Sequence, residues 1–119
     1  MHEPVANALV VDDDAALRML CRVNLELEGF AVREAATLSE AESAVGEARP
    51  DVVLLDMHLG GDDARGLLER LRADGIPVAL VTGSGDLDDY RGLADAVIGK
   101  PFVPRDLVET ARRLARVRT

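Results

Sequence analysis

The stretch Val52-Val53-Leu54-Leu55-Asp56 places a carboxylate directly after a run of four apolar residues. Three other short apolar runs likewise lead into polar residues, which are Asp12-Asp13, Thr82 and Lys100. Apolar runs that alternate with helical segments are typical of a parallel sheet buried on both faces, where ligands bind beyond the carboxyl ends of the strands. We therefore expect polar groups from four strand ends to converge on one acidic pocket containing a single cation.

The segments between these runs have helical periodicity, which predicts five strands alternating with helices. The expected strands cover 8–11, 30–34, 52–55, 77–81 and 96–98. The expected helices cover 15–28, a segment from Thr37 or Ser39 to 48, 64–73, 86–93 and 104–117. The fourth of these has room for at most two turns, and the glycine-rich segment 60–63 is expected to be a loop. The pattern predicts an α/β three-layer sandwich with helices on both faces of a parallel sheet.

The size and charge of the chain limit what it can be. With 119 residues it can form one core but not two, so we expect a single domain over residues 1–119. The net charge of −8 argues against a nucleic-acid partner. The apolar runs are far shorter than the roughly 20 residues that span a bilayer. The N-terminus does not resemble a secretory signal. We therefore expect a cytoplasmic protein that binds neither nucleic acid nor a membrane.

Two further features have simple structural explanations. Cys21, the only cysteine, cannot form an internal disulfide and is expected to be a core residue in a helix. Basic residues cluster near the C-terminus, at Arg112, Arg113, Arg116 and Arg118. They suit the dipole at the end of a helix, although a binding site for an anionic partner is the alternative.

The expected pocket has a definite chemistry. Carboxylates as close as Asp12, Asp13 and Asp56 must recruit a cation or raise one another's pKa. Mg²⁺ suits such a site because it prefers oxygen ligands and binds one or two carboxylates together with a phosphate oxygen. Lys100 and Thr82 could then contact a phosphoryl group, and Asp56 could be the nucleophile that forms an acyl phosphate. Alternatively, one aspartate of the 12–14 triplet caps the first helix, and each remaining residue taken alone could be structural.

The four strand-end motifs together resemble the receiver domain of two-component response regulators, over nearly the whole chain. They read Val-Val-Asp12-Asp13, Leu-Leu-Asp56, Val-Thr82-Gly and Lys100-Pro101-Phe102. The resemblance implies a flavodoxin-like fold whose five-stranded parallel sheet has the order 2-1-3-4-5. It also implies that Asp56 accepts a phosphoryl group from a histidine kinase or phosphotransfer protein.

The resemblance assigns roles to the other site residues. Asp13, Asp56 and the main-chain carbonyl of His58 would bind Mg²⁺ directly, while Asp12 would act largely through water. Lys100 and Thr82 would contact the phosphoryl group, and the Lys100–Pro101 peptide bond would be cis. For the side chain of His58 we expect a partly exposed loop position, with an influence on hydrolysis of the acyl phosphate as the alternative.

The sequence departs from the usual receiver pattern at three places. Val97 stands where receivers usually carry an aromatic residue that reports phosphorylation. Gly60 and Gly61 lie in a loop that normally contains a proline. The spacing between Thr82 and Lys100 is short, so the fourth helix is expected to be shortened. We therefore hypothesise that phosphorylation is signalled by a change in how well ordered the loop over residues 83–90 is.

The expected function is that of a phosphoaccepting signalling protein, not an enzyme beyond its own phosphotransfer and dephosphorylation. We expect no output domain after the fifth helix, and therefore protein–protein contact with an unknown downstream protein. One alternative is a small phosphohydrolase of the haloacid dehalogenase type, with Asp12 as nucleophile and Asp14 as acid–base. The other is a pseudo-receiver that binds its partner without phosphorylation.

Overall fold

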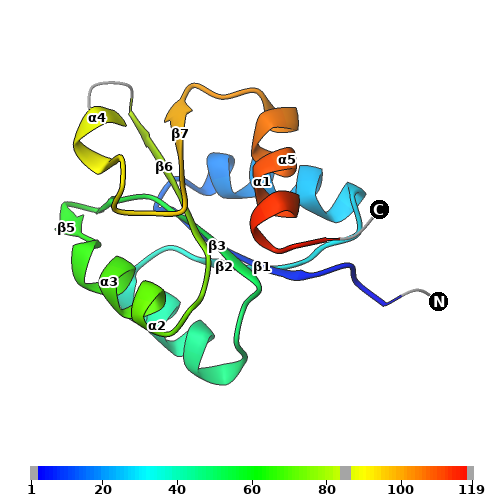
Figure 1. Ribbon diagram of the computed structural model, residues 1–119, viewed down its shortest axis with the longest axis horizontal. Coiled ribbons are helices and arrows are strands. Elements are labelled where there is room, and N and C mark those ends of the chain that lie inside the picture. Colours follow the sequence, from blue (N-terminus) through cyan, green and yellow to red (C-terminus); the bar gives the residue numbers. More distant parts are fainter. Residues whose placement is uncertain (1–2, 84–86, 118–119) are drawn as a thin grey trace.

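A central five-stranded parallel sheet lies between two layers of helices in the computed structural model, which describes residues 3–83 and 87–117 (Figure 1). The strands of this sheet are β1 (Asn7–Val11), β2 (Ala31–Ala35), β3 (Val52–Leu55), β6 (Val78–Gly83) and β7 (Ala96–Lys100). Their order across the sheet is β2-β1-β3-β6-β7. Numbered within this sheet alone, that order is 2-1-3-4-5, so the predicted flavodoxin-like α/β topology is confirmed.

The helices cover both faces of the sheet. On one face lie α1 (Ala15–Leu27) and α5 (Pro104–Leu114) (Figure 1). On the other face lie α2 (Leu38–Glu47), α3 (Arg65–Ala73) and α4 (Leu87–Tyr90). The expected shortening of the fourth helix is confirmed, because α4 contains only four residues. This arrangement is the predicted three-layer sandwich.

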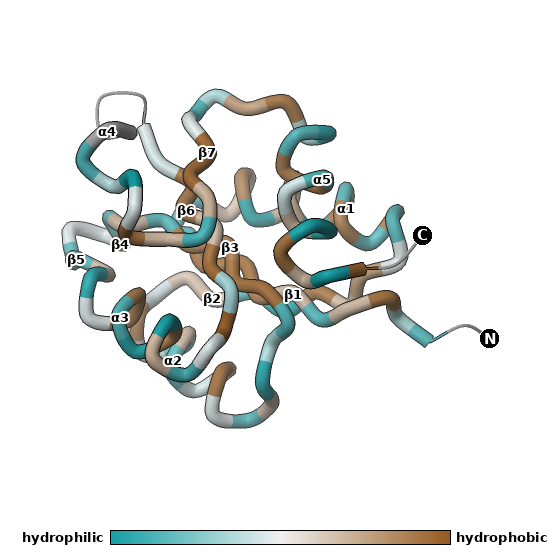
Figure 2. Tube along the Cα trace, in the orientation of Figure 1, coloured by the Kyte–Doolittle hydropathy of each residue, from teal (hydrophilic) through white to brown (hydrophobic). Residues whose placement is uncertain are grey.

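The sheet separates two apolar clusters because successive strand residues point to opposite faces. In β3, Val53 and Leu55 belong to the cluster under α2 and α3, whereas Val52 and Leu54 belong to the cluster under α1 and α5. All four side chains are buried. Figure 2 shows the central strands as the most hydrophobic part of the trace. Burial of each such side chain contributes roughly 1.5–3 kcal/mol to folding, which explains why the strand sequences are almost wholly apolar.

The ends of the first two helices show which polar residues are structural. The Asp14 carboxylate accepts hydrogen bonds from the main-chain N–H groups of Ala16 and Leu17, so Asp14 is the N-cap of α1. Thr37, not Ser39, caps α2 by accepting a hydrogen bond from Glu40 N. One aspartate of the triplet thus has the capping role considered from the sequence, and Asp12 and Asp13 lie outside the cap.

The segment expected to be a loop after β3 is a short hairpin. Its strands are β4 (His58–Leu59) and β5 (Asp62–Asp63), which pair in antiparallel fashion. Gly60 and Gly61 form the two-residue turn with φ angles of 56° and 93°. Two successive positive φ angles match the twist of a tight hairpin and favour glycine at both positions. Helix α5 is also shorter than predicted, ending at Leu114 instead of 117.

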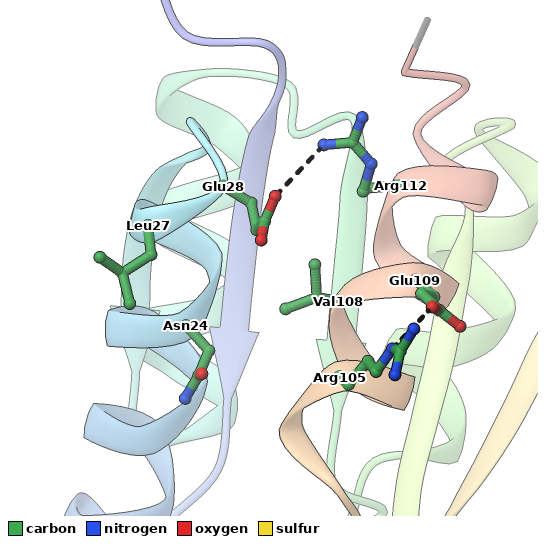
Figure 3. Close-up of a pocket in the computed structure, with 7 residues that line it drawn as sticks. All are labelled: Asn24, Leu27, Glu28, Arg105, Val108, Glu109 and Arg112. Atoms are coloured by element: carbon green, nitrogen blue, oxygen red, sulfur yellow. Dashed lines mark hydrogen bonds and ion pairs between the residues drawn. The ribbon is translucent and has the colours of Figure 1, made fainter. Parts of the chain in front are cut away.

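A groove of about 400 Å³ separates α1 from α5 (Figure 3). Arg112 Nη1 lies 3.8 Å from Glu28 Oε2 across it, so one cation of the basic run has an intramolecular partner. Arg118 lies outside the described residues. Asn24 interrupts the apolar stripe of α1, and its amide donates a 2.8 Å hydrogen bond to the Leu20 carbonyl. Cys21 is buried in the cluster under α1, as predicted.

Within residues 3–83 and 87–117, the helices are too short and too polar for any of them to span a membrane.

Candidate functional site

Four strands of the sheet end close together because they are parallel and in register. Val11 pairs with Leu55, so β1 and β3 are level at their carboxyl ends, and Leu55 pairs with Leu80 of β6, which continues to Gly83. Asp12 and Asp56 are the residues that directly follow β1 and β3. Thr82 pairs with Gly99 at the adjoining ends of β6 and β7, and Lys100 is the last residue of β7. The predicted convergence of strand-end residues is therefore present.

Three carboxylates form the centre of the site. Asp12, Asp13 and Asp56 each offer an oxygen, and these oxygens lie within 4.8 Å of one another. Asp12 and Asp56 are only 3% and 7% exposed, while Asp13 is exposed. Hard oxygen ligands on one open side fit a small divalent cation such as Mg²⁺, which keeps part of its water shell. Asp14, by contrast, is engaged at the N-terminus of α1.

Lys100 is the cation of the pocket. Its Nζ donates a 3.1 Å hydrogen bond to Asp12 Oδ2 and lies 3.5 Å from Asp56 Oδ2. Burial of the ammonium group lowers the pKa of Lys100, but the hydrogen bond and charge of Asp12, followed by the charge of Asp56, outweigh it. The net pKa is therefore raised. Lys100 remains protonated at neutral pH and supplies a fixed positive charge beside Asp56.

Asp12 shows the cost of crowding acidic groups in a buried site. Its pKa is raised, chiefly because burial disfavours the charged form, and the nearby charge of Asp56 adds to the effect. Hydrogen bonds from Asp14 N and Lys100 act in the opposite direction without cancelling it. A divalent cation between these carboxylates would stabilise their ionised forms, so the electrostatics of the site favour metal binding.

The hydroxyl group of Thr82 is buried without a hydrogen-bond partner among the described residues. Thr82 is 1% exposed, and its Oγ1 has no hydrogen-bond partner among the residues that the structure describes. An unpaired buried hydroxyl typically costs about 1–3 kcal/mol. Its place at the strand ends makes it a candidate donor to an oxygen of a phosphoryl group.

Main-chain N–H groups hold all three carboxylates in place. Asp56 Oδ1 accepts a 3.1 Å hydrogen bond from His58 N, and Asp13 Oδ2 accepts one of 3.0 Å from Gly60 N. Asp12 Oδ1 accepts a 2.9 Å bond from Asp14 N. Sequence patterns did not reveal these donors, because any residue can supply a main-chain N–H. The glycine pair was the available signal for an unusual turn beside the site.

His58 and the fourth helix are in direct contact. The hydroxyl of Tyr90 in α4 lies 3.3 Å from Nε2 of His58. Tyr90 is buried in the cluster under α2 and α3, so it is mainly a packing residue, and Val97 packs against the same cluster. The Lys100–Pro101 bond is cis, as expected. Of the segment 83–90, which we considered as the signalling element, residues 84–86 lie outside the described residues.

Comparisons with known proteins agree with this geometry. Residues 8–112 match the family model of the response regulator receiver domain. The chain is 36% identical over 116 residues to the phosphate regulon transcriptional regulatory protein PhoB of Pseudomonas aeruginosa, covering 91% of this chain and 51% of that protein. It is 44% identical over 115 residues to the DNA-binding response regulator MtrA of Mycobacterium tuberculosis, covering 92% of this chain and 50% of that protein. The chain thus spans about half the length of these curated relatives.

Solved structures show the same fold. The receiver domain of NtrX from Brucella abortus superposes with a TM-score of 0.85 at 29% identity, covering 93% of this chain and 99% of that one. A CheY-like response regulator receiver domain protein from Methanospirillum hungatei superposes with a TM-score of 0.84 at 32% identity, covering 93% and 94%. The similarity therefore extends through the sheet that carries the acidic cluster.

Proposed function

The chain belongs to the response regulator receiver domain family, whose members serve in two-component signal transduction, and on this basis we propose that Asp56 is its phosphoacceptor. The observation that supports the proposal most directly is the cluster of Asp12, Asp13 and Asp56 oxygens, with Lys100 Nζ close to Asp12 and Asp56. The donor is a phosphohistidine of a histidine kinase or phosphotransfer protein. The proposed role is phosphotransfer to the protein itself and its own dephosphorylation by hydrolysis of the acyl phosphate, not turnover of a separate substrate.

The reaction is a transfer of one phosphoryl group. A carboxylate oxygen of Asp56 forms a bond to phosphorus as the bond from phosphorus to the histidine nitrogen breaks, and the electron pair of that bond stays on the imidazole. Lys100 stabilises the negative charge on the transferred group, and the Thr82 hydroxyl donates to one of its oxygens. Each of these groups is fixed by its strand before the donor arrives, which reduces the reorganisation that the reaction requires.

A magnesium ion would be held by Asp13, Asp56 and the main-chain carbonyl of His58, with Asp12 acting largely through water. The residues present fit this ion, because they offer only oxygen ligands and one side of the cluster is exposed. When bound, Mg²⁺ neutralises charge on the phosphoryl oxygens and on the acceptor carboxylate. The hydrogen bonds from His58 N and Gly60 N keep the two carboxylates oriented toward one another.

The signal is proposed to pass by protein–protein contact to a downstream partner. The expectation of no nucleic-acid partner concerns these 119 residues only. It stays a prediction, because MtrA, a relative of about twice this length, is named as DNA-binding. The single-domain organisation and the cytoplasmic location also stay predictions.

Phosphorylation with acetyl phosphate and Mg²⁺, followed by mapping of the modified residue, tests the proposal. We expect one phosphoryl group on Asp56 and its loss in Asp56→Asn. Asp14→Asn is the matched control, because asparagine also caps helices well and Asp14 lies outside the cluster. A label on Asp12 would instead support the phosphohydrolase alternative, although the capping role of Asp14 removes the acid–base that such an enzyme needs. Absence of any label, also with a partner kinase, would favour the pseudo-receiver.

A further inference from the structure

Arg18 lies in α1, outside the acidic cluster, yet it contacts the main chain from which two of the carboxylates extend. Its Nη1 donates a 2.8 Å hydrogen bond to the carbonyl oxygen of Asp12. That carbonyl belongs to the peptide unit joining Asp12 to Asp13. Its direction therefore sets the orientation of the Asp13 N–H and, through it, the path of the chain at Asp13.

Arg18 is itself fixed by a second contact. Its Nε donates to Glu34 Oε1 at 3.1 Å, and Glu34 lies in β2 opposite Val10 of β1. The side chains of Arg18 and Glu34 are only 18% and 27% exposed. The planar guanidinium group thus joins the sheet at β2 to the peptide unit after β1, and its two donors are held at a fixed angle. A lysine could reach only one of these partners at a time.

The remaining polar groups of Asp12 are engaged elsewhere. Its N–H donates to the Ala35 carbonyl at 3.1 Å, and its carboxylate accepts from Asp14 N and Lys100 Nζ. Arg18 supplies the hydrogen bond to its carbonyl oxygen. Without that bond, the Asp12 carbonyl loses the hydrogen bond that orients it. The bond from Gly60 N still holds the Asp13 carboxylate but not the peptide unit itself, which gains freedom to rotate.

We propose that Arg18 is a positioning residue, which orients the Asp12–Asp13 peptide unit so that both carboxylates face the magnesium ion. The inference rests on the proposed function, since it concerns the same site. Mg²⁺ requires nearly ideal octahedral geometry, so a small rotation of Asp13 weakens binding. Loss of residues that orient metal ligands typically lowers metal affinity by about 10- to 100-fold.

Arg22 provides a matched control on the same helix. Its Nη1 donates to the other oxygen of Glu34 at 2.9 Å, so Arg22 contacts the same residue of β2 as Arg18 does. The described contacts of Arg22 are with Glu34 and Glu26, and none is with Asp12. If the only role of Arg18 were to connect α1 with β2, replacing Arg18 or Arg22 would have similar effects on Mg²⁺ affinity. If Arg18 positions the Asp12–Asp13 peptide unit, only its replacement would lower that affinity.

The test measures Mg²⁺ affinity of the unphosphorylated protein by calorimetry, alongside the Mg²⁺ dependence of phosphorylation by acetyl phosphate. We expect Arg18→Met to weaken Mg²⁺ binding by about tenfold or more and to raise the Mg²⁺ concentration needed for phosphorylation, with the rate recovering at saturating Mg²⁺. Arg18→Lys should recover part of the affinity, because one donor can still reach the Asp12 carbonyl. Arg22→Met should bind Mg²⁺ as the unsubstituted protein does.

Equal Mg²⁺ affinity in Arg18→Met and Arg22→Met would overturn the positioning role while leaving the proposed function intact. If the unsubstituted protein neither bound Mg²⁺ nor accepted a phosphoryl group, both proposals would fail. Thermal unfolding without Mg²⁺ reports any general loss of stability. Should Arg18→Met not fold, the Mg²⁺ affinities of Arg18→Lys and Arg22→Lys are compared instead, and equal affinities would again overturn the positioning role.

Discussion

The hydroxyl oxygen of Tyr90 in α4 lies 3.3 Å from Nε2 of His58, the residue two positions after Asp56. Because His58 N also donates to Asp56 Oδ1, a continuous set of contacts leads from the acidic cluster to the fourth helix. The position that carries the usual aromatic residue in receivers is Val97, which has no hydroxyl group. The His58–Tyr90 contact therefore joins two segments that lie 32 residues apart in the chain.

Replacing Tyr90 by phenylalanine should lower the free energy of unfolding by about 1 kcal/mol, because the hydrogen bond between the Tyr90 hydroxyl and His58 is lost while the ring packing is kept. Urea denaturation without Mg²⁺ measures this. A double-mutant cycle with His58→Gln isolates the pair, since both residues have other contacts. Additive effects of the two substitutions would show that the contact contributes nothing.

Lys100→Met should separate metal binding from phosphotransfer. Lys100 competes with a metal ion for Asp12 and Asp56, so its removal should tighten Mg²⁺ binding. Phosphorylation should nevertheless slow by roughly 100-fold or more, because a fixed donor to the transferred group is lost. Rates with acetyl phosphate at saturating Mg²⁺ measure this. Arg105→Met, which removes an exposed cation of α5, is the control and should leave both quantities unchanged.

Thr82→Val should have opposite effects on stability and activity. Its hydroxyl has no partner among the described residues, so an apolar side chain of similar shape should keep or raise the free energy of unfolding. Phosphorylation should slow, because the donor to the phosphoryl group is gone. Thr37→Val is the contrasting control: its hydroxyl caps α2, and its loss should cost about 1 kcal/mol. A Thr82→Val protein of normal activity would exclude the proposed contact.

Cys21 predicts a specific pH dependence of stability. Burial raises the pKa of its thiol to about 11, from 9.0 for an exposed thiol. Between these values the unfolded chain releases the proton while the folded chain keeps it, so stability is full below pH 9 and falls as pH rises toward 11. The loss should be roughly 2–3 kcal/mol. Comparing denaturation curves with those of Cys21→Ala removes the contribution of other groups; identical pH dependence would contradict the burial effect.

The sequence predicted the parts of the site that depend on strand periodicity. Asp56 follows four apolar residues, and any parallel sheet built from such runs brings the ends of its strands to one edge. The capping role of Asp14 could not be separated from Asp12 or Asp13, because three identical residues offer the same chemistry. The hairpin at Gly60 and Gly61 was missed because strands of two residues have no detectable period.

Long-range contacts were beyond sequence reasoning for a different reason. The bond from Gly60 N to Asp13 joins residues 47 positions apart, and it uses a main-chain donor that every non-proline residue possesses. Sequence reasoning does not distinguish Arg18 from Arg22, because both are arginines on the same helix. In the structure both contact Glu34. Only the packing of α1 on the sheet decides which arginine reaches the Asp12 carbonyl.

The two apolar clusters on opposite sides of the sheet share no side chain among the described residues. Tyr90 belongs to one of them, whereas Cys21 and Leu107 belong to the other. Repacking beneath α1 and α5 can therefore be used to raise thermal tolerance without touching the side chains around Tyr90. Protein engineers thus have the cluster beneath α1 and α5 available for redesign, while the packing around Tyr90 is kept.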